Sequence, residues 1–280
     1  MYQERPSRVA GAVLWRGGAP EADTGTGTGG VRRVLPDGCM DLIWIGGGLL
    51  VAGPDTAAHT VTDAPGDAYT GLRFDPGLGP SVIGTPAAEL RDLRVPLAEL
   101  WPTEQVRILT ERLAEAPAPG RVLESIAADL PRHSGLADPI APAVLAHLRA
   151  PPGGTAPGSG RDPPRVRAAA DAVGLSERQL HRRCLTAFGY GPKTLDRILR
   201  MNRALDMARA GTPLALAAAA AGYADQAHLT REVRSLTGVP PGSLVGQRAG
   251  SGGSPRPGAP EPVPSAPRSR RGPIRSQRLP

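Results

Sequence analysis

Three side chains near residue 180 have the types and spacing that reading DNA bases would need. Arg178, His181 and Arg182 lie three and four residues apart, so a helix would carry them on one face. Arginine donates paired hydrogen bonds to the O6 and N7 acceptors of guanine in the major groove. The alternative is the solvated face of an ordinary helix, and one such arginine alone would not decide between the two.

The same pattern returns further along the chain. Four positions recur after 49 residues: Leu180, Arg182, Gly189 and Pro192 are followed by Leu229, Arg231, Gly238 and Pro241. Just upstream the interval is 48 residues, because the first copy has one residue fewer in a turn. A repeat whose length difference falls in a turn indicates two copies of one helix-turn-helix unit.

The second copy presents a related set of side chains on the equivalent face. The methyl groups of alanine and threonine suit the methyl group of thymine, and arginine again suits guanine. We therefore predict base contacts from six residues, three in each copy: Arg178, His181, Arg182, Ala227, Thr230 and Arg231.

Each predicted recognition helix has residues that define its start and its buried face. Gly174 and Gly222 lie where the preceding helix needs a left-handed residue to end. Ser176 and Asp225 stand where the next helix needs an N-cap, and Gln179 completes a capping box in the first copy. Apolar residues at every fourth position predict the buried face: Leu180, Cys184, Phe188, Leu229 and Val233.

A second group of residues is predicted to contact the DNA backbone. The N-terminus of a helix binds phosphate through its free N–H groups, which applies at Ser176 and Asp225. Cations close to these ends can position the phosphates further, namely Arg183, Lys193 and Arg197.

This stretch resembles the tandem helix-turn-helix domain of the AraC/XylS family of bacterial transcription regulators. The matching segments are 174–176 (GLS), 180–183 (LHRR), 188–193 (FGYGPK), 222–232 (GYADQAHLTRE) and 238–240 (GVP). The resemblance implies a connecting helix over residues 194–210 and two recognition helices in successive major grooves on one side of the duplex. Four core positions are smaller than is usual in the family, which thins each core: Ala169, Cys184, Ala217 and Val233.

The N-terminal part has the pattern of short strands separated by tight turns. The predicted strands are residues 31–35, 41–45, 49–52 and 68–74. Such a pattern is typical of a small barrel or sandwich. This part resembles an N-terminal domain of unknown function that often precedes AraC-type domains, in residues 34–44 (VLPDGCMDLIW), 52–56 (AGPDT) and 71–77 (GLRFDPG). The resemblance implies a cupin-like β-barrel for sensing or dimerisation and names no ligand.

We predict an α+β protein with two domains. The predicted segments are an N-terminal sensing or dimerisation domain at 1–149 (a small cupin-like β-barrel at 1–84, helices at 85–149), a flexible linker at 150–163, an all-α tandem helix-turn-helix domain at 164–246 and a disordered basic tail at 247–280. The helices at 85–149 either pair two subunits or only cover the barrel. The tail either adds non-specific phosphate contacts or is an unselected extension.

Charge is distributed unevenly along the 280 residues. Residues 1–160 hold 13 arginines against 18 acidic residues, a net charge of −5, whereas residues 161–240 and 241–280 each carry +6. Positive charge therefore gathers where DNA phosphates would be met, and such contacts make affinity fall steeply with salt.

No group of side chains in the sequence has the residue types and spacing of a catalytic site. Cys39 would need an activating base to accept an alkyl group, and no such motif accompanies it. His59 alone cannot supply the histidines of a cupin metal centre. The glycines of residues 21–30 (EADTGTGTGG) lack the ending of a phosphate-binding loop. One further set either lines a pocket or only forms turns and barrel-mouth charges: Asp37, Asp41, Arg73 and Asp75.

The combined pattern predicts a cytoplasmic, sequence-specific transcription regulator that binds double-stranded DNA, without enzyme activity, cofactor, metal or membrane contact. We expect control by a small-molecule effector or by homodimer formation through the N-terminal domain, with RNA polymerase as a partner if the protein activates. Two rivals stay open. One is a DNA-repair-linked regulator or alkyltransferase that uses Cys39, and the other is a protein-interaction module whose repeat no longer binds DNA.

Overall fold

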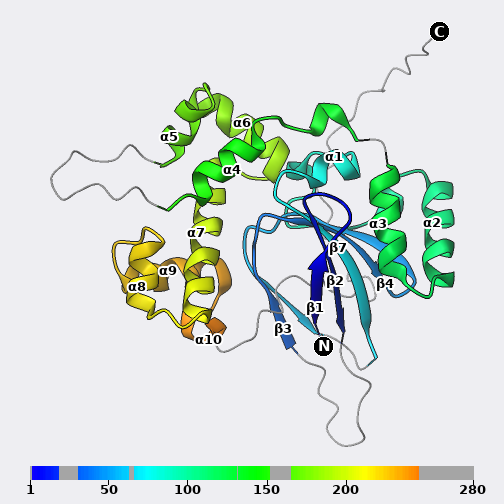
Figure 1. Cartoon of the computed structure of the whole chain (residues 1–280), viewed down its shortest axis with the longest axis horizontal. Helices are drawn as coiled ribbons and strands as arrows, with labels where there is room; N and C mark the ends of the chain where they lie inside the picture. The colour runs from blue at the N-terminus through cyan, green and yellow to red at the C-terminus, as the bar shows by residue number, and fades with distance from the viewer. Residues whose placement is uncertain (1, 19–30, 63–65, 131, 152–164, 246–280) are drawn as a thin grey trace, which may run out of the picture.

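The chain folds into a sheet region (residues 2–130) and a helical region (residues 141–245) that lie side by side (Figure 1). The computed structural model describes residues 2–18, 31–62, 66–130, 132–151 and 165–245. The predicted loop at 21–30, residues 152–163 of the predicted linker and the predicted tail at 247–280 lie outside the described residues.

Eight strands form two antiparallel sheets. The larger sheet has the order β1-β2-β7-β4-β5-β8, and the smaller one pairs β3 with β6. The strand bounds are β1 Gln3–Pro6, β2 Ala12–Gly18, β3 Val31–Val34, β4 Met40–Ile45, β5 Gly48–Ala52, β6 His59–Thr62, β7 Ala68–Phe74 and β8 Arg94–Pro96.

The central strands are apolar on both faces because both faces are covered. On one face the register aligns Leu14, Leu72, Leu42 and Val51 in a row across four strands. On the other face lie Trp15, Ile43 and Tyr69, all buried. Gly71 stands opposite Trp15 in the ladder, and a Cβ atom there would come within 2.2 Å of the indole ring. The absence of a side chain at Gly71 therefore leaves the space that the Trp15 ring occupies.

The α+β class and the antiparallel, sheet-rich N-terminal part are confirmed, but the closed barrel is not. Among the described strands, no hydrogen-bonded ladder joins the six-stranded sheet to the two-stranded one. Strands β1 and β8 are the two edges of the six-stranded sheet. The predicted strands correspond to β3, β4, β5 and β7. Four further strands were not predicted: β1, β2, β6 and β8.

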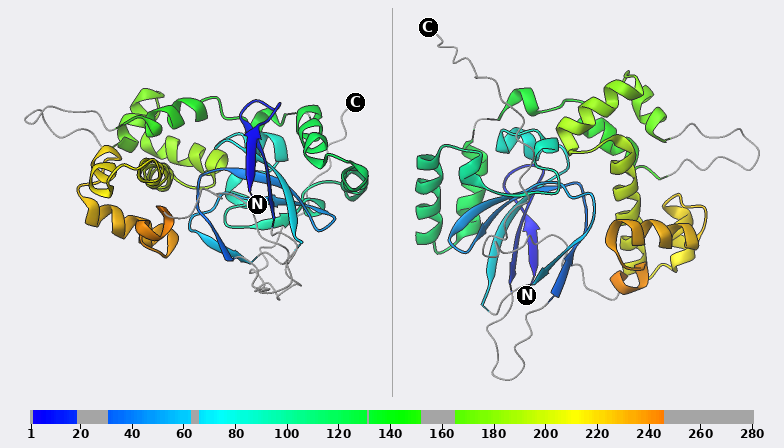
Figure 2. Two further views of the ribbon diagram at one scale, coloured as in Figure 1. Left: turned by 60° about the horizontal axis from the view of Figure 1, so that its bottom comes forward. Right: turned by 180° about the vertical axis from the view of Figure 1, so that it is seen from behind.

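Helices cover the face of the sheet that carries Leu42 and Leu72. Figures 1 and 2 show α2 and α3 on the side of the sheet away from the helical region. Val106, Leu109 and Leu113 of α2 and Leu123 and Ile126 of α3 are buried in the same core as that face. The bounds are α1 Gly79–Ile83, η1 Ala87–Glu89, η2 Leu97–Glu99, α2 Thr103–Glu115, α3 Pro119–Asp129 and η3 Ser134–Leu136. These helices therefore cover the sheet, and pairing of two subunits stays a prediction.

The helical region is built around one central helix. Its elements are α4 Ala141–Arg149, α5 Arg165–Ala172, α6 Glu177–Phe188, α7 Pro192–Arg209, α8 Leu214–Ala220, α9 Gln226–Thr237 and α10 Pro241–Val245. Val144 and Leu148 of α4 share a core with Leu195 and Ile198 of α7, so α4 packs with the helical region although the predicted domain boundary follows it. In the described part of the chain, no helix is long and apolar enough to cross a membrane.

An ion pair between an exposed arginine on β1 and a buried glutamate on α3 joins the first edge strand to the helices that cover the sheet. Both terminal nitrogens of Arg5 donate to the carboxylate of Glu124, each at 2.9 Å, and the backbone N–H of Arg8 donates to it at 3.0 Å. Glu124 is 3% exposed. The hydrogen bonds from Arg5 lower the pKa of Glu124 to about 2.

This ion pair predicts a pH-dependent contribution to stability. Because the pKa of Glu124 is lower in the folded chain, its stabilisation is complete above about pH 4.5 and is lost as the pH falls towards 2. We expect Glu124→Gln to lower the free energy of unfolding at pH 7 by about 1–3 kcal/mol, since the partner Arg5 is partly exposed. Urea titrations at several pH values should show this difference shrinking below pH 4.

The matched control is Glu104→Gln, which breaks a fully exposed ion pair with Arg107 on α2. Solvent screens that pair, so stability should stay nearly unchanged at every pH. A loss for Glu124→Gln that persists unchanged at pH 2 would show that packing, and not charge, explains the effect.

Candidate nucleic-acid interface

The first helix-turn-helix unit consists of α5, a short turn and α6. Gly174 has φ of +67°, the left-handed conformation predicted for the end of α5. The hydroxyl of Ser176 accepts the backbone N–H of Gln179, whose side chain completes the capping box. Leu180, Cys184 and Phe188 are buried, as their spacing predicted.

The second unit repeats this geometry with α8 and α9. Gly222 has φ of +82° in the turn. The carboxylate of Asp225 accepts the backbone N–H of His228 at 2.6 Å and caps α9. Leu229 and Val233 form its buried face. The predicted local chemistry of both units is therefore present.

Helix α7 holds the two units in one body (Figure 1). Leu195, Ile198, Met201 and Leu205 on α7 are completely buried among residues of both units. Arg200 adds a polar link, since its guanidinium donates to the carbonyl of Ala221 in the second turn. Sequence reasoning missed this role of Arg200, because its acceptors are backbone carbonyls with no sequence signature.

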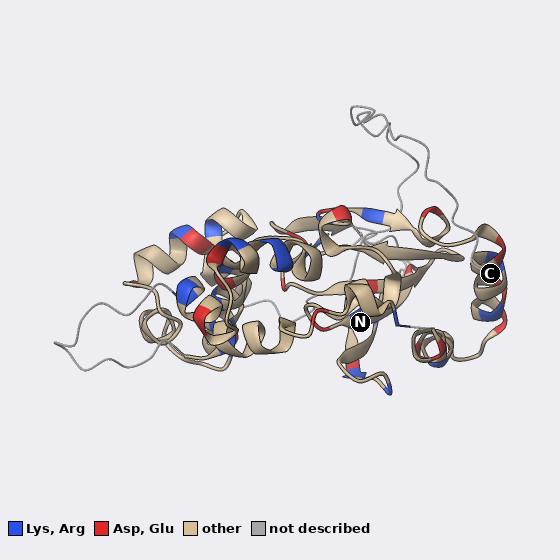
Figure 3. Cartoon of the chain, turned by 90° about the horizontal axis from the view of Figure 1, so that it is seen from above, with Lys and Arg blue, Asp and Glu red and all other residues tan. Residues whose placement is uncertain are grey.

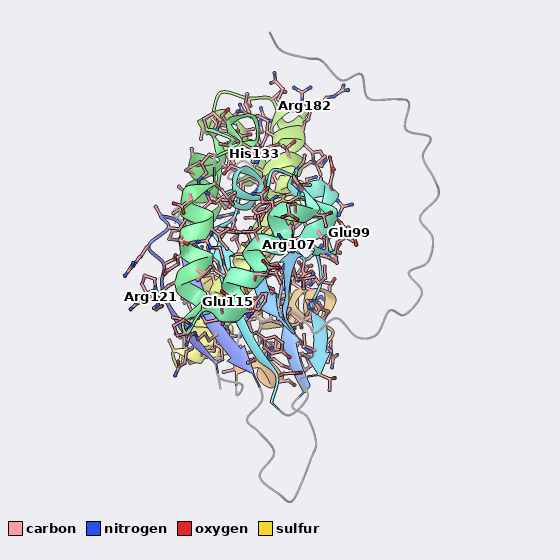
Figure 4. The ribbon with its side chains drawn as sticks, turned by 90° about the vertical axis from the view of Figure 1, so that its right-hand side faces the viewer. Glu99, Arg107, Glu115, Arg121, His133 and Arg182 are labelled. Carbon is pink, nitrogen blue, oxygen red and sulfur yellow. The ribbon has the colours of Figure 1, made fainter. Side chains whose placement is uncertain are left out.

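The residues predicted to contact bases lie on the open side of both recognition helices. Arg178, His181 and Arg182 on α6 are exposed, and Figure 4 shows Arg182 pointing away from the sheet. Ala227 and Arg231 on α9 are also exposed, and Thr230 is half-buried. The hydroxyl of Thr230 donates to the carbonyl of Gln226 at 2.9 Å. All six residues lie in the N-terminal half of their helices.

The lysine and arginine residues of the helical region fall into two groups. Figure 3 shows them spread over the helices with acidic residues among them. Six arginines bind acidic groups or backbone carbonyls: Arg165, Arg183, Arg197, Arg200, Arg203 and Arg209. Seven other cations have no partner among the described residues: Arg149, Arg167, Arg178, Arg182, Lys193, Arg231 and Arg234.

Two of the residues predicted to hold phosphate already have acidic partners. Arg183 forms a bidentate pair with Asp138, at 2.8 and 2.7 Å. Arg197 binds Glu232 at 2.8 Å, whereas Lys193 is exposed and free of any described partner. Arg183 and Arg197 would have to exchange these carboxylates for phosphate. Asp138 was missed at the sequence level because its partner lies 45 residues away.

Both recognition helices meet the sheet region with their C-terminal ends. The carbonyl of Gly189, after α6, accepts a hydrogen bond from Arg91 at 3.3 Å. At the end of α9, the carbonyl of Leu236 accepts the N–H of Ala58 at 2.7 Å, and that of Thr237 accepts from Arg33 at 2.8 Å. The sheet region therefore holds both helices while their N-terminal halves stay open to solvent.

A buried charge cluster lies under the turn after β3. The Arg73 guanidinium is 3.4 Å from the carboxylate of Asp41 and 3.6 Å from that of Asp37. Asp41 also accepts the indole N–H of Trp15 at 2.6 Å, and burial raises its pKa to about 6. Asp37 accepts the N–H of Cys39 at 2.8 Å, which is the turn-forming role considered for it.

The chemistry of Cys39 and of the acidic residues does not point to a reaction centre. Loss of solvent contact and the neighbouring carboxylate of Asp37 raise the pKa of the Cys39 thiol. A raised pKa disfavours the thiolate that alkyl transfer would use. Among the described residues, no three His, Cys, Asp or Glu side chains gather where they could hold a metal ion.

Comparison with known proteins gives two family matches. Residues 169–247 match a family described as helix-turn-helix domain, and residues 15–96 match a domain of unknown function (DUF6597). No curated protein sequence matches the chain.

The chain has a low similarity to solved structures of ToxT from Vibrio cholerae. An apo variant has 10% identity and a TM-score of 0.42, over 86% of this chain and 98% of that one. The unsaturated fatty acid bound protein has 8% identity and a TM-score of 0.42, over 86% and 96%. A likeness at this level says nothing about what the present chain binds.

The equivalent glycines at the ends of the two recognition helices allow a matched test of the docking. Gly189 and Gly238 both have left-handed φ, +83° and +77°. A Cβ at Gly189 would lie 2.5 Å from the Pro54 ring, whereas one at Gly238 would meet only Arg33, at 3.6 Å. We expect Gly238→Ala to cost about 1 kcal/mol for the backbone conformation alone. Gly189→Ala should cost about 1–3 kcal/mol more, because it also separates α6 from the sheet region.

Denaturant unfolding of both variants measures this difference. Limited proteolysis between the two regions should be faster for Gly189→Ala only. Equal losses in the two variants would show that the close approach at Gly189 is not needed for docking.

Proposed function

We propose that this chain, which carries an AraC-type helix-turn-helix domain behind a DUF6597 domain, is a sequence-specific DNA-binding transcription regulator. The observation that carries the proposal is the pair of capped recognition helices with exposed cations in their N-terminal halves. Arg178 and Arg182 on α6, and Arg231 on α9, have no partner among the described residues.

The N-terminal half of a recognition helix is the part that reaches base edges in the major groove. Arginines there can each read a guanine, and the methyl groups of Ala227 and Thr230 can meet thymine. His181 has a ring nitrogen for a purine acceptor. The three residues on α6 would read the bases of one half-site, and the three on α9 would read those of the other, so each half-site would have its own base preference.

Phosphate contacts would position the protein on the duplex. The capped N-termini at Ser176 and Asp225 offer backbone N–H groups, and Lys193 adds a free charge close to the first unit. Arg183 and Arg197 would also bind phosphate, once their ion pairs with Asp138 and Glu232 are broken.

The sheet region is the part through which activity would be controlled. It contacts both recognition helices, so a small molecule or a second subunit bound to it could change how they are held. The protein would act in the cytoplasm, and it would contact RNA polymerase if it activates. Selection from random DNA sequences tests the proposal. An enriched motif with two half-sites is expected, and no enrichment would favour the protein-interaction module.

The rival enzyme activity has its own test. Incubation with alkylated DNA and measurement of the intact mass should leave Cys39 unmodified, because the environment of its thiol disfavours the thiolate. A stable mass increase on Cys39 would establish the alkyltransferase.

Replacement of the exposed arginines predicts a change in sequence preference. Arg182→Ala and Arg231→Ala should each weaken binding to the selected DNA by about 1–3 kcal/mol and relax the preference at one base pair. Arg112→Ala on α2 removes the same charge from an exposed position outside the helical region and should leave affinity unchanged. Competition binding against single-base variants measures this. An equal loss on every sequence would assign the arginine to a phosphate.

The ion pair between Asp138 and Arg183 predicts a substitution that strengthens DNA binding instead of weakening it. Asp138→Asn removes the negative charge, while its amide oxygen can still accept the N–H of Ile140, as the carboxylate does at 3.0 Å. Arg183 would then reach phosphate without losing a partner, so DNA affinity should rise. The slope of log Kobs against log salt should steepen by about 0.9. Fluorescence anisotropy at several salt concentrations measures it, and Arg183→Ala in the same background should abolish the gain.

A further inference from the structure

A cavity of about 700 Å³ lies between the sheet region and helix α4. Its walls are the turn after β1 at Ala10 and Gly11, the segment after β7 at residues 75–78, and the face of α4 that carries Leu145 and Ala146. Figure 1 shows α4 beside α6 in the helical region, to the left of α1 and of the upper end of the sheet. The volume is within the range of sites that hold small molecules, which is about 300–1,000 Å³.

The lining of this cavity is mostly apolar and made of small residues. Alanine, glycine, proline and leucine supply most of it, and Ser81 and three charged residues complete it. Asp138 is engaged by Arg183, whereas Asp75 and Arg149 are exposed and opposite in sign. The described lining therefore offers an ionised ligand no buried countercharge, and burying such a charge unpaired is costly.

The same walls touch the first recognition helix. A Cβ at Gly77 would lie 3.0 Å from the ring of Phe188 at the end of α6 and 3.1 Å from Ala141 on α4. Asp138, in the segment before α4, binds Arg183 on α6. An occupant of the cavity would therefore lie against the residues that set the position of α6.

We propose that this cavity binds an uncharged, predominantly apolar small molecule, such as an aromatic or alicyclic compound, and that its occupant braces the sheet region against α4 and α6. Contact with the apolar lining would supply the binding energy, since transfer of apolar surface from water to an apolar environment is favourable. The consequence for DNA affinity rests on the proposed function, but the binding itself does not.

The experiment uses N-phenyl-1-naphthylamine, an uncharged probe that fluoresces in apolar surroundings, titrated into the full-length protein. Ala146→Phe fills the cavity from an exposed position on α4. Ala143→Phe is the matched control, because Ala143 is exposed on the same helix and does not line the cavity. We expect saturable binding to the unchanged protein and to Ala143→Phe, and an affinity at least tenfold lower for Ala146→Phe.

Circular dichroism and thermal unfolding check that the variants fold. If Ala146→Phe does not fold, Ala10→Phe fills the cavity from the opposite wall and should give the same loss. Absence of saturable binding, or equal binding by Ala143→Phe and the filled variant, overturns the proposal. A dimer seen by sedimentation that Ala146→Phe abolishes, with no probe bound, would assign the surface to a second copy of the chain and also overturn it.

The probe and the DNA give separate readouts. Saturable probe binding without an enriched DNA motif would keep the ligand site and refute the proposed function. An enriched motif without probe binding would do the reverse. Where both hold, the probe should change the affinity for the selected DNA in the unchanged protein and in Ala143→Phe, and not in Ala146→Phe.

Discussion

The contact between the C-terminal ends of the recognition helices and the sheet region is the constraint on which the other features depend. Gly189 allows the end of α6 to approach Pro54 and Ala87 more closely than a side chain would permit. The end of α9 is held by backbone carbonyls that accept from Ala58 and Arg33. Because docking uses only these ends, the opposite halves of both helices remain accessible.

The arginines of the helical region differ in whether they have a hydrogen-bonding partner within the chain. Arg165, Arg183 and Arg200 are held by carboxylates or carbonyls of neighbouring helices and turns, which fixes the arrangement of the helices. Those in the N-terminal halves of α6 and α9 are left for an external ligand. Asp138 links the two groups, because it accepts the N–H of Ile140 just before α4, binds Arg183 and lines the apolar cavity.

The helix-turn-helix units could be predicted from the sequence because the residues that form their turns and caps act on close neighbours in the chain. Gly174, Ser176 and Asp225 act within a few residues, and the structure shows the turn and caps that they predicted. Long-range contacts left no such signal: the pairs Arg5–Glu124 and Asp138–Arg183 join segments 119 and 45 residues apart. Strands β1 and β8 are short edge strands that lack alternation, so their periodicity could not identify them. The prediction of a closed barrel is wrong because short strands separated by tight turns occur in open sheets as well as in barrels, so this pattern does not distinguish the two.

Helix α4 has a consequence for where this protein can be divided. The family match to the helix-turn-helix domain begins at residue 169, but Val144, Leu145 and Leu148 of α4 lie in the same apolar core as α5 and α7. A fragment cut at the family boundary would expose that core to water. The smallest autonomous unit should therefore start ahead of residue 141, with α4 as an N-terminal brace that the repeat itself does not encode.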